Sequence, residues 1–125
     1  MYYNKYIDLA NQIFLFIFVF SLQCSKTENY TIHKKMKVWH ISDTHNFHHQ
    51  LNIPEGIDLV IHTGDCSNRM DPYTNEPEVR QFIEWYEQVP IPNKIFIPGN
   101  HDTSIERNLI KGSDFISAGI HLLNH

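Results

Sequence analysis

The 125-residue sequence is poor in positive charge and in cysteine. Ten lysines and arginines stand against fourteen aspartates and glutamates, which argues against a polybasic protein that binds nucleic acid through its phosphates. Two cysteines are too few for a disulfide framework or a four-cysteine zinc site. The 42% hydrophobic and 13% aromatic content argues against a disordered tail, and the length suits one small domain.

Long apolar runs and glycine-rich phosphate loops are also missing. The longest apolar stretch extends from Ile13 to Leu22, with Ser21 as its one interruption. It is shorter than the roughly 20 residues that a helix needs to span a bilayer. Neither of the glycine patterns that wrap the phosphates of dinucleotides or of ATP occurs in the sequence, so it gives no sign of those two binding classes.

Residues 1–35 form an N-terminal extension with three open interpretations. The Ile13–Leu22 run has the length of the apolar part of a signal peptide, with Lys5 before it, but no small-residue cleavage site follows. Residues 1–24 would then export the protein or attach it to a membrane. Alternatively, translation starts at Met36 and the protein is cytoplasmic. The third interpretation is an ordinary packed helix.

From Met36 onward, three segments share one pattern, a short apolar run followed by a polar cluster. The runs Val38–Ile41, Ile57–Ile61 and Lys94–Ile97 predict buried strands because β-branched and aromatic residues dominate them. In open α/β sheets, ligands bind beyond the carboxyl ends of the strands. We therefore expect the three polar clusters to meet at one edge of a sheet.

The segment between the second and third runs predicts the crossover helix that parallel neighbours need. Asn75 is the expected N-cap and Glu78 its capping-box partner. Weaker patterns predict a short helix at 104–111, a turn at 113–117 and a fourth strand at 120–123. The expected buried face of the crossover helix consists of Val79, Phe82, Ile83 and Tyr86.

The polar clusters contain residue types that bind metal ions. Asp43 and His45 lie two residues apart, so in an extended segment both side chains face the same way. Asp65 follows a glycine, and Asn100 and His101 follow a Pro-Gly turn. Carboxylate, imidazole and amide ligands together suit Mn, Fe or Zn better than Ca, which prefers oxygen.

Three motifs, Asp43-x-His45, Gly64-Asp65 and Gly99-Asn100-His101-Asp102, occur in this order, each after a predicted strand. Together they resemble the calcineurin-like metallophosphoesterases. The resemblance implies an α/β fold, the αββα sandwich of that family. Residues 36–125 would form a partial metallophosphoesterase domain, its first half, with three to four strands and the crossover helix.

The resemblance also implies two divalent cations, Mn, Fe or Zn. Asp43 and His45 would bind the first, Asp65 would bridge both, and Asn100 would bind the second. His101 is similar to the catalytic histidine that protonates the leaving group. Two cations about 3.5–4 Å apart clamp a phosphoryl group and turn a bound water into hydroxide. The implied reaction is hydrolysis of a phosphate ester. The compact spacing between the motifs, without a large insertion, favours a small phosphodiester as the substrate.

The sequence lacks the Gly-His-x-His motif with which the family completes its site. His121 and His125 are the only histidines after His101, and neither has the expected context. We therefore expect the chain to be an incomplete fragment, and we do not expect full activity from the 125 residues alone. The alternative is a non-catalytic, truncated protein that serves as a binding or interaction module.

Neighbouring residues receive structural or mixed interpretations. Asp102 would either orient a histidine or cap the segment that begins at Thr103, and the cap is the favoured interpretation. Arg69 lies where some relatives bind phosphate, but Asn68 stands in place of their aspartate, and an exposed loop arginine is the equal alternative. Among the remaining candidates, Cys66 is expected to be packed, His40 and His62 to lie in the core or behind the ligands, and His33, His48 and His49 to be exposed.

Overall fold

The computed structural model describes residues 35–123, and the fold is given for these residues. The Ile13–Leu22 run, His33 and His125 lie outside them, so the interpretations of the N-terminal extension stay predictions. Within residues 35–123, no helix is both long and apolar enough to cross a membrane.

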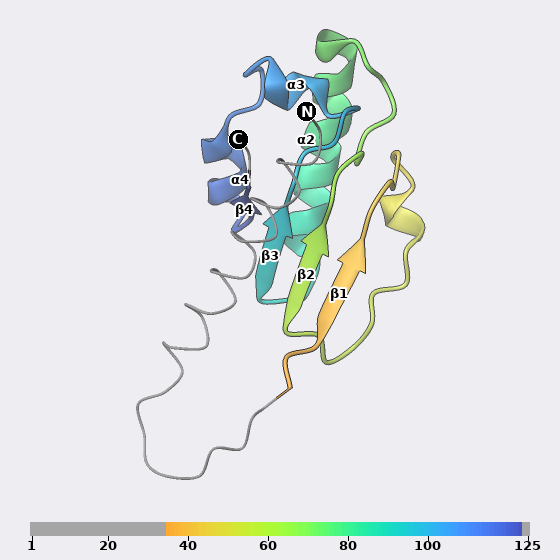
Figure 1. Ribbon diagram of the computed structural model, residues 1–125, viewed down its shortest axis with the longest axis vertical. Helices are drawn as coiled ribbons and strands as arrows, with labels where there is room; N and C mark the ends of the chain where they lie inside the picture. Colours follow the sequence, from red (N-terminus) through yellow and green to blue (C-terminus); the bar gives the residue numbers. More distant parts are fainter. Residues whose placement is uncertain (1–34, 124–125) are drawn as a thin grey trace, which may run out of the picture. The chain divides into compact units, whose positions relative to one another are not determined.

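Four parallel strands form one sheet, in the order in which they occur along the chain (Figure 1). Ile41, His62 and Phe96 lie side by side at the ends of the first three strands, so the loops that follow leave the sheet at one edge. The predicted parallel α/β arrangement is confirmed, although the fourth strand is shorter than expected. The strands are β1 (Val38–Ile41), β2 (Leu59–His62), β3 (Asn93–Phe96) and β4 (His121–Leu122).

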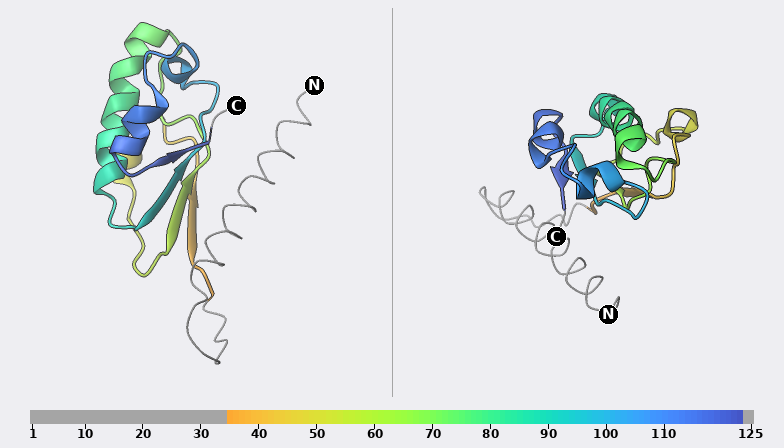
Figure 2. Two further views of the ribbon diagram at one scale, coloured as in Figure 1. Left: turned by 90° about the vertical axis from the view of Figure 1, so that its left-hand side faces the viewer. Right: turned by 90° about the horizontal axis from the view of Figure 1, so that it is seen from above.

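The helices form a second layer beside the sheet. They are the 3-10 helix η1 (His48–Gln50) and the α-helices α2 (Pro72–Gln88), α3 (Thr103–Glu106) and α4 (Gly112–Ser117). Figure 2 shows α2, α3 and α4 on the same face of the sheet. On that face Tyr86 is fully buried, and its hydroxyl donates to the backbone oxygen of Ile95, at 2.9 Å. This contact ties the crossover helix to the sheet.

Helix α2 begins earlier than predicted. Its N-cap is Asp71, whose Oδ1 accepts a hydrogen bond from the backbone N–H of Thr74 at 3.1 Å, and Pro72 occupies the first turn. Proline suits that position because its missing N–H would have no partner there. The prediction of Asn75 as N-cap is therefore wrong. The predicted buried face of the helix is confirmed.

Two histidines lie in the core. His62 is fully buried, as expected; its Nδ1 accepts from the N–H of Gly64, and its Nε2 pairs with the hydroxyl of Thr44 at 2.9 Å. His48 was expected to be exposed, but it is 1% exposed and neither ring nitrogen has a hydrogen-bond partner. The expectation is wrong because η1 packs on α2, where His48 meets the rings of Phe82 and Trp85.

Burial keeps both histidines neutral. It lowers the pKa of His62 to about 3, helped by the neighbouring His48. Burial also lowers the pKa of His48 to about 4, with a further contribution from His49. In the unfolded chain a histidine titrates near about 6.5. The unfolded chain therefore binds more protons than the folded chain below that pH, and the fold loses stability as the pH falls from about 6.5 towards 4.

We expect His48→Phe to reduce this acid sensitivity. Relative to the parent, the unfolding free energy of the variant should rise by about 1–2 kcal/mol more at pH 5 than at pH 8. The reason is that one of the two histidines with a lowered pKa has been removed. The phenyl ring also removes two buried nitrogens that lack partners. Urea unfolding at pH 8, 6 and 5 measures both effects. Parallel pH dependences in the variant and the parent would contradict the prediction.

Candidate metal centre

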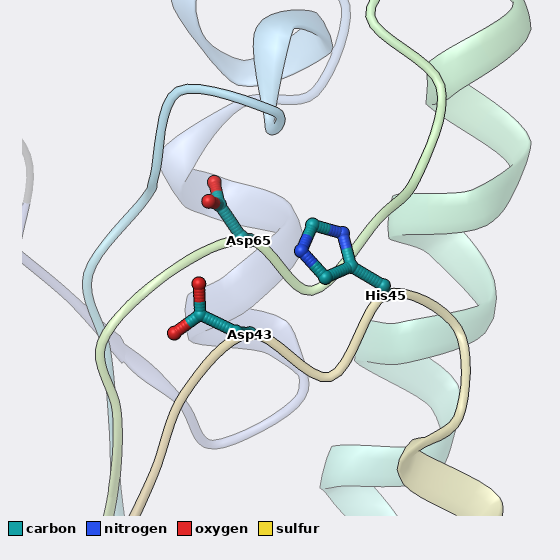
Figure 3. A group of neighbouring side chains, drawn as sticks. All are labelled: Asp43, His45 and Asp65. Carbon is teal, nitrogen blue, oxygen red and sulfur yellow. The ribbon is translucent and has the colours of Figure 1, made fainter.

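Three predicted metal ligands meet beyond the carboxyl ends of the strands. Asp43 and His45 come from the loop after β1, and Asp65 comes from the loop after β2 (Figure 3). One ligand atom from each residue lies within 4.8 Å of the others. Asp43 is exposed, whereas His45 and Asp65 are half-buried, so the group is open to solvent on one side.

The backbone of both loops is strained at these residues. Asp43, His45 and Asp65 have positive φ angles of 53°, 40° and 56°, a region that costs a residue with a side chain on the order of 1–3 kcal/mol. Backbone hydrogen bonds hold the loops side by side, from Asp43 to Gly64 at 3.0 Å and from His45 to Asp65 at 3.1 Å. Strain of this kind gathers at functional sites, where it holds side chains in a set arrangement.

A third loop, after β3, reaches the same place through Gly99. A Cβ atom on Gly99 would lie 2.5 Å from the backbone nitrogen of Asp65 and would overlap its carboxylate. A residue without a side chain is therefore required there. The backbone N–H of His101 then donates to Oδ1 of Asp65 at 2.9 Å, which orients this carboxylate.

Both histidines of the site bind carbonyl groups through Nδ1. The Nδ1 of His45 lies 2.9 Å from the backbone oxygen of Ser67, and the Nδ1 of His101 lies 3.0 Å from that of Asn68. A carbonyl oxygen only accepts, so in each ring Nδ1 carries the hydrogen and Nε2 is left as the acceptor of the neutral ring. Figure 3 shows the Nε2 edge of His45 turned towards the two carboxylates.

The remaining predicted site residues lie in the loop after β3. His101 is half-buried, and its ring packs edge-on against that of His45, with 4.8 Å between the ring centres. Asn100 precedes it and is exposed. The assignments of Asn100 to a second metal and of His101 to proton donation stay predictions.

Asp102 occupies the N-cap position of α3, as expected, but its side chain makes no capping hydrogen bond. Its carboxylate is 1% exposed and holds the site loops instead. Oδ2 accepts from the N–H groups of Asp65 and Gly99, both at 2.9 Å. Oδ1 accepts from the N–H and hydroxyl of Ser67 and from the thiol of Cys66. Burial and this neighbouring carboxylate raise the pKa of Cys66, which is packed as expected.

Two residues of α2 support the site in ways that the sequence interpretation missed. Asn75 is fully buried; its Nδ2 approaches the backbone oxygens of Arg69 and His101, and its Oδ1 accepts from the N–H of Ser104. Glu78 binds the backbone of the loop after β2. The Asp-Pro pair at positions 71–72 is the sequence feature that marks the true start of the helix. Asn75 and Glu78 therefore lie inside the helix and do not cap it.

Comparison with known proteins identifies the family. Residues 36–122 match the profile of the calcineurin-like phosphoesterases. The chain belongs to this family. Metallophosphoesterase domain-containing protein 1 from Homo sapiens and from Mus musculus is 34% identical over 70 residues, 56% of this chain and 20% of theirs. A protein from Emericella nidulans named "Probable rhamnogalacturonate lyase C" is 38% identical over 68 residues, 54% of this chain and 6% of its own.

The chain thus matches a fifth or less of the length of these relatives. Calcineurin-like phosphoesterases bind divalent metal ions and hydrolyse phosphoesters. The Asp43–His45–Asp65 group fits a divalent ion, because two carboxylates and one imidazole converge within 4.8 Å. The parallel four-strand sheet with its helices is consistent with the fold of the family.

Proposed function

We propose that the protein hydrolyses a small phosphate ester, preferably a phosphodiester, as part of a longer phosphoesterase. The observation that supports this is the convergence of Asp43, His45 and Asp65 on strained, mutually bonded loops. These three residues and Asn100 would hold two divalent cations, Mn, Fe or Zn. When bound, the cations supply Lewis-acid activation of the phosphoryl group and of the attacking water.

The chain's own residues would position the reacting groups. The Nδ1–H of His45 is engaged with Ser67, which leaves Nε2 for the metal. His101 is anchored in the same way on Asn68, which fixes the orientation of its ring. With a proton on Nε2, it would act as the general acid that protonates the leaving oxygen.

The charge around the site favours a small substrate. Residues 36–125 carry six basic and twelve acidic side chains, which does not suit a long nucleic-acid backbone. Arg69 is an exposed loop arginine in an ion pair with Glu78, with 3.3 Å between Nε and Oε1. Its guanidinium is thus already engaged by a carboxylate of the same chain.

The test is metal-dependent hydrolysis. The 125-residue chain and the native polypeptide are assayed with Mn2+ on an aryl phosphodiester and on an aryl phosphomonoester. We expect at least a hundredfold loss of rate after metal removal with EDTA, recovery on adding Mn2+ back, and a preference for the diester. A native mass above 14.8 kDa would support the fragment interpretation. Mn2+ binding without hydrolysis by either polypeptide would overturn the proposal and favour a binding module.

A further inference from the structure

Two consecutive peptide groups connect one carboxylate to both histidines of the site. The first joins Ser67 to Asn68: its carbonyl accepts from Nδ1 of His45 at 2.9 Å, and its N–H donates to Oε2 of Glu78 at 2.8 Å. The second joins Asn68 to Arg69: its carbonyl accepts from Nδ1 of His101 at 3.0 Å, and its N–H donates to the same Oε2 at 2.9 Å. The two bridges share a single oxygen atom.

A peptide group transmits the effect of a charge from its N–H to its carbonyl. The amide is a resonance system, so an anion at the N–H increases the negative charge on the oxygen of the same group. Hydrogen bonds that follow one another through such a chain polarise and strengthen one another. The carboxylate of Glu78 therefore makes the Ser67 and Asn68 carbonyls better acceptors for the two Nδ1–H groups.

Glu78 is placed to act on the loops as an ion. Its side chain is 16% exposed, and it also binds the side chain of Asn46, the residue after His45. Burial alone would raise the pKa of Glu78, but the backbone N–H groups of Arg69 and Asn68, the Asn46 side chain and the nearby guanidinium outweigh it, and the pKa is lowered. One carboxylate on α2 thus reaches the loops after β1 and β2.

We propose that Glu78 is the positioning residue that holds His45 and His101 as Nδ1–H tautomers, through the peptide groups 67–68 and 68–69. This arrangement keeps Nε2 of His45 unprotonated for a metal ion and aims His101 for its part in the reaction. The second half of this role rests on the proposed function. The tautomers themselves exist in the metal-free protein and are measured without any reaction.

The experiment compares Glu78→Ala and Glu78→Gln with Glu76→Gln in the full chain. Glu76 lies on the same helix and forms its ion pair with Arg80, away from the loops, so its variant controls for the loss of one charge. Ring-nitrogen NMR at pH 8.5, above the ordinary histidine pKa, identifies the tautomers, with His45→Gln and His101→Gln used for assignment. Calorimetry with Mn2+ alone measures metal affinity.

The proposal expects both rings as Nδ1–H tautomers in the parent and in Glu76→Gln. In Glu78→Ala both rings should become tautomer mixtures, and Mn2+ binding should weaken at least tenfold, the range seen when partners of metal-binding histidines are removed. Glu78→Gln keeps one acceptor oxygen and should fall between the two, which separates positioning from failure to fold. Unchanged tautomers and Mn2+ affinity in Glu78→Ala would overturn the proposal. Altered tautomers, together with no hydrolysis by the native polypeptide, would support it while refuting the proposed function.

Discussion

Asp65→Asn is expected to lower metal-dependent phosphoester hydrolysis about a thousandfold without unfolding the protein. Asp65 is one of two carboxylates in the ligand group, and the amide removes its charge while keeping its shape. Metal ions contribute several kcal/mol to transition-state stabilisation, and about 4 kcal/mol corresponds to a thousandfold in rate. The amide oxygen of the variant still accepts the N–H of His101, so the loop geometry should persist.

The matched control is Asp114→Asn. That carboxylate accepts from the backbone N–H of Lys111 at the start of α4, and its replacement also removes one negative charge. Rates, Mn2+ affinity by calorimetry and circular dichroism are compared for the parent and both variants. If Asp65→Asn keeps the parent rate and affinity, Asp65 is not a metal ligand and the assignment of the centre fails.

The strands and the ligand group could be predicted from the sequence because both depend on short-range patterns. An apolar run followed by a polar cluster indicates where a buried strand ends. Parallel strands place these ends at the same edge of the sheet. Asp43, His45 and Asp65 follow such ends, and the structure brings them together. The buried face of α2 followed from helical spacing in the same way.

The contacts that support the site could not be predicted from the sequence, because they depend on the course of the backbone in the loops, which no local sequence pattern indicates. Asp102 and Glu78 bind main-chain N–H groups of loops with positive φ angles, and such groups are the same for every residue type. His48 was misjudged because its burial comes from the packing of η1 on a helix far along the chain. Asn75 was misjudged because the Asp71–Pro72 pair, at which the helix begins, was not weighed.

Replacing Asp102 should produce the largest loss of stability in the described part of the chain. Its carboxylate receives five hydrogen bonds at 2.7–3.3 Å while being 1% exposed. Asp102→Ala leaves these donors buried without an acceptor, at about 1–3 kcal/mol for each group that finds no new partner. We expect a loss of at least about 4 kcal/mol of unfolding free energy, a large part of the roughly 5–15 kcal/mol of a small domain.

Asp102→Asn gives a graded result, because its amide can accept only on one side. Whichever way the amide turns, its NH2 group faces donors, either those of Asp65 and Gly99 or those of Ser67 and Cys66. A loss of about 2–3 kcal/mol is expected. Asp71→Ala, which removes the exposed N-cap of α2, is the control and should cost about 1 kcal/mol.

Urea unfolding of the three variants at pH 7.5 measures these differences, and Mn2+ calorimetry follows the site. Because Asp65 and Gly99 share Oδ2 of Asp102, the loss of this oxygen frees the loop that carries a metal ligand and the loop that packs against it. Asp102→Asn should therefore weaken Mn2+ binding in the molecules whose amide NH2 faces Asp65 and Gly99, even where the protein remains folded, whereas Asp71→Ala should not. A loss below about 1 kcal/mol in Asp102→Ala would show that the five donors find other partners, and the loops would then owe their arrangement to the backbone hydrogen bonds between them.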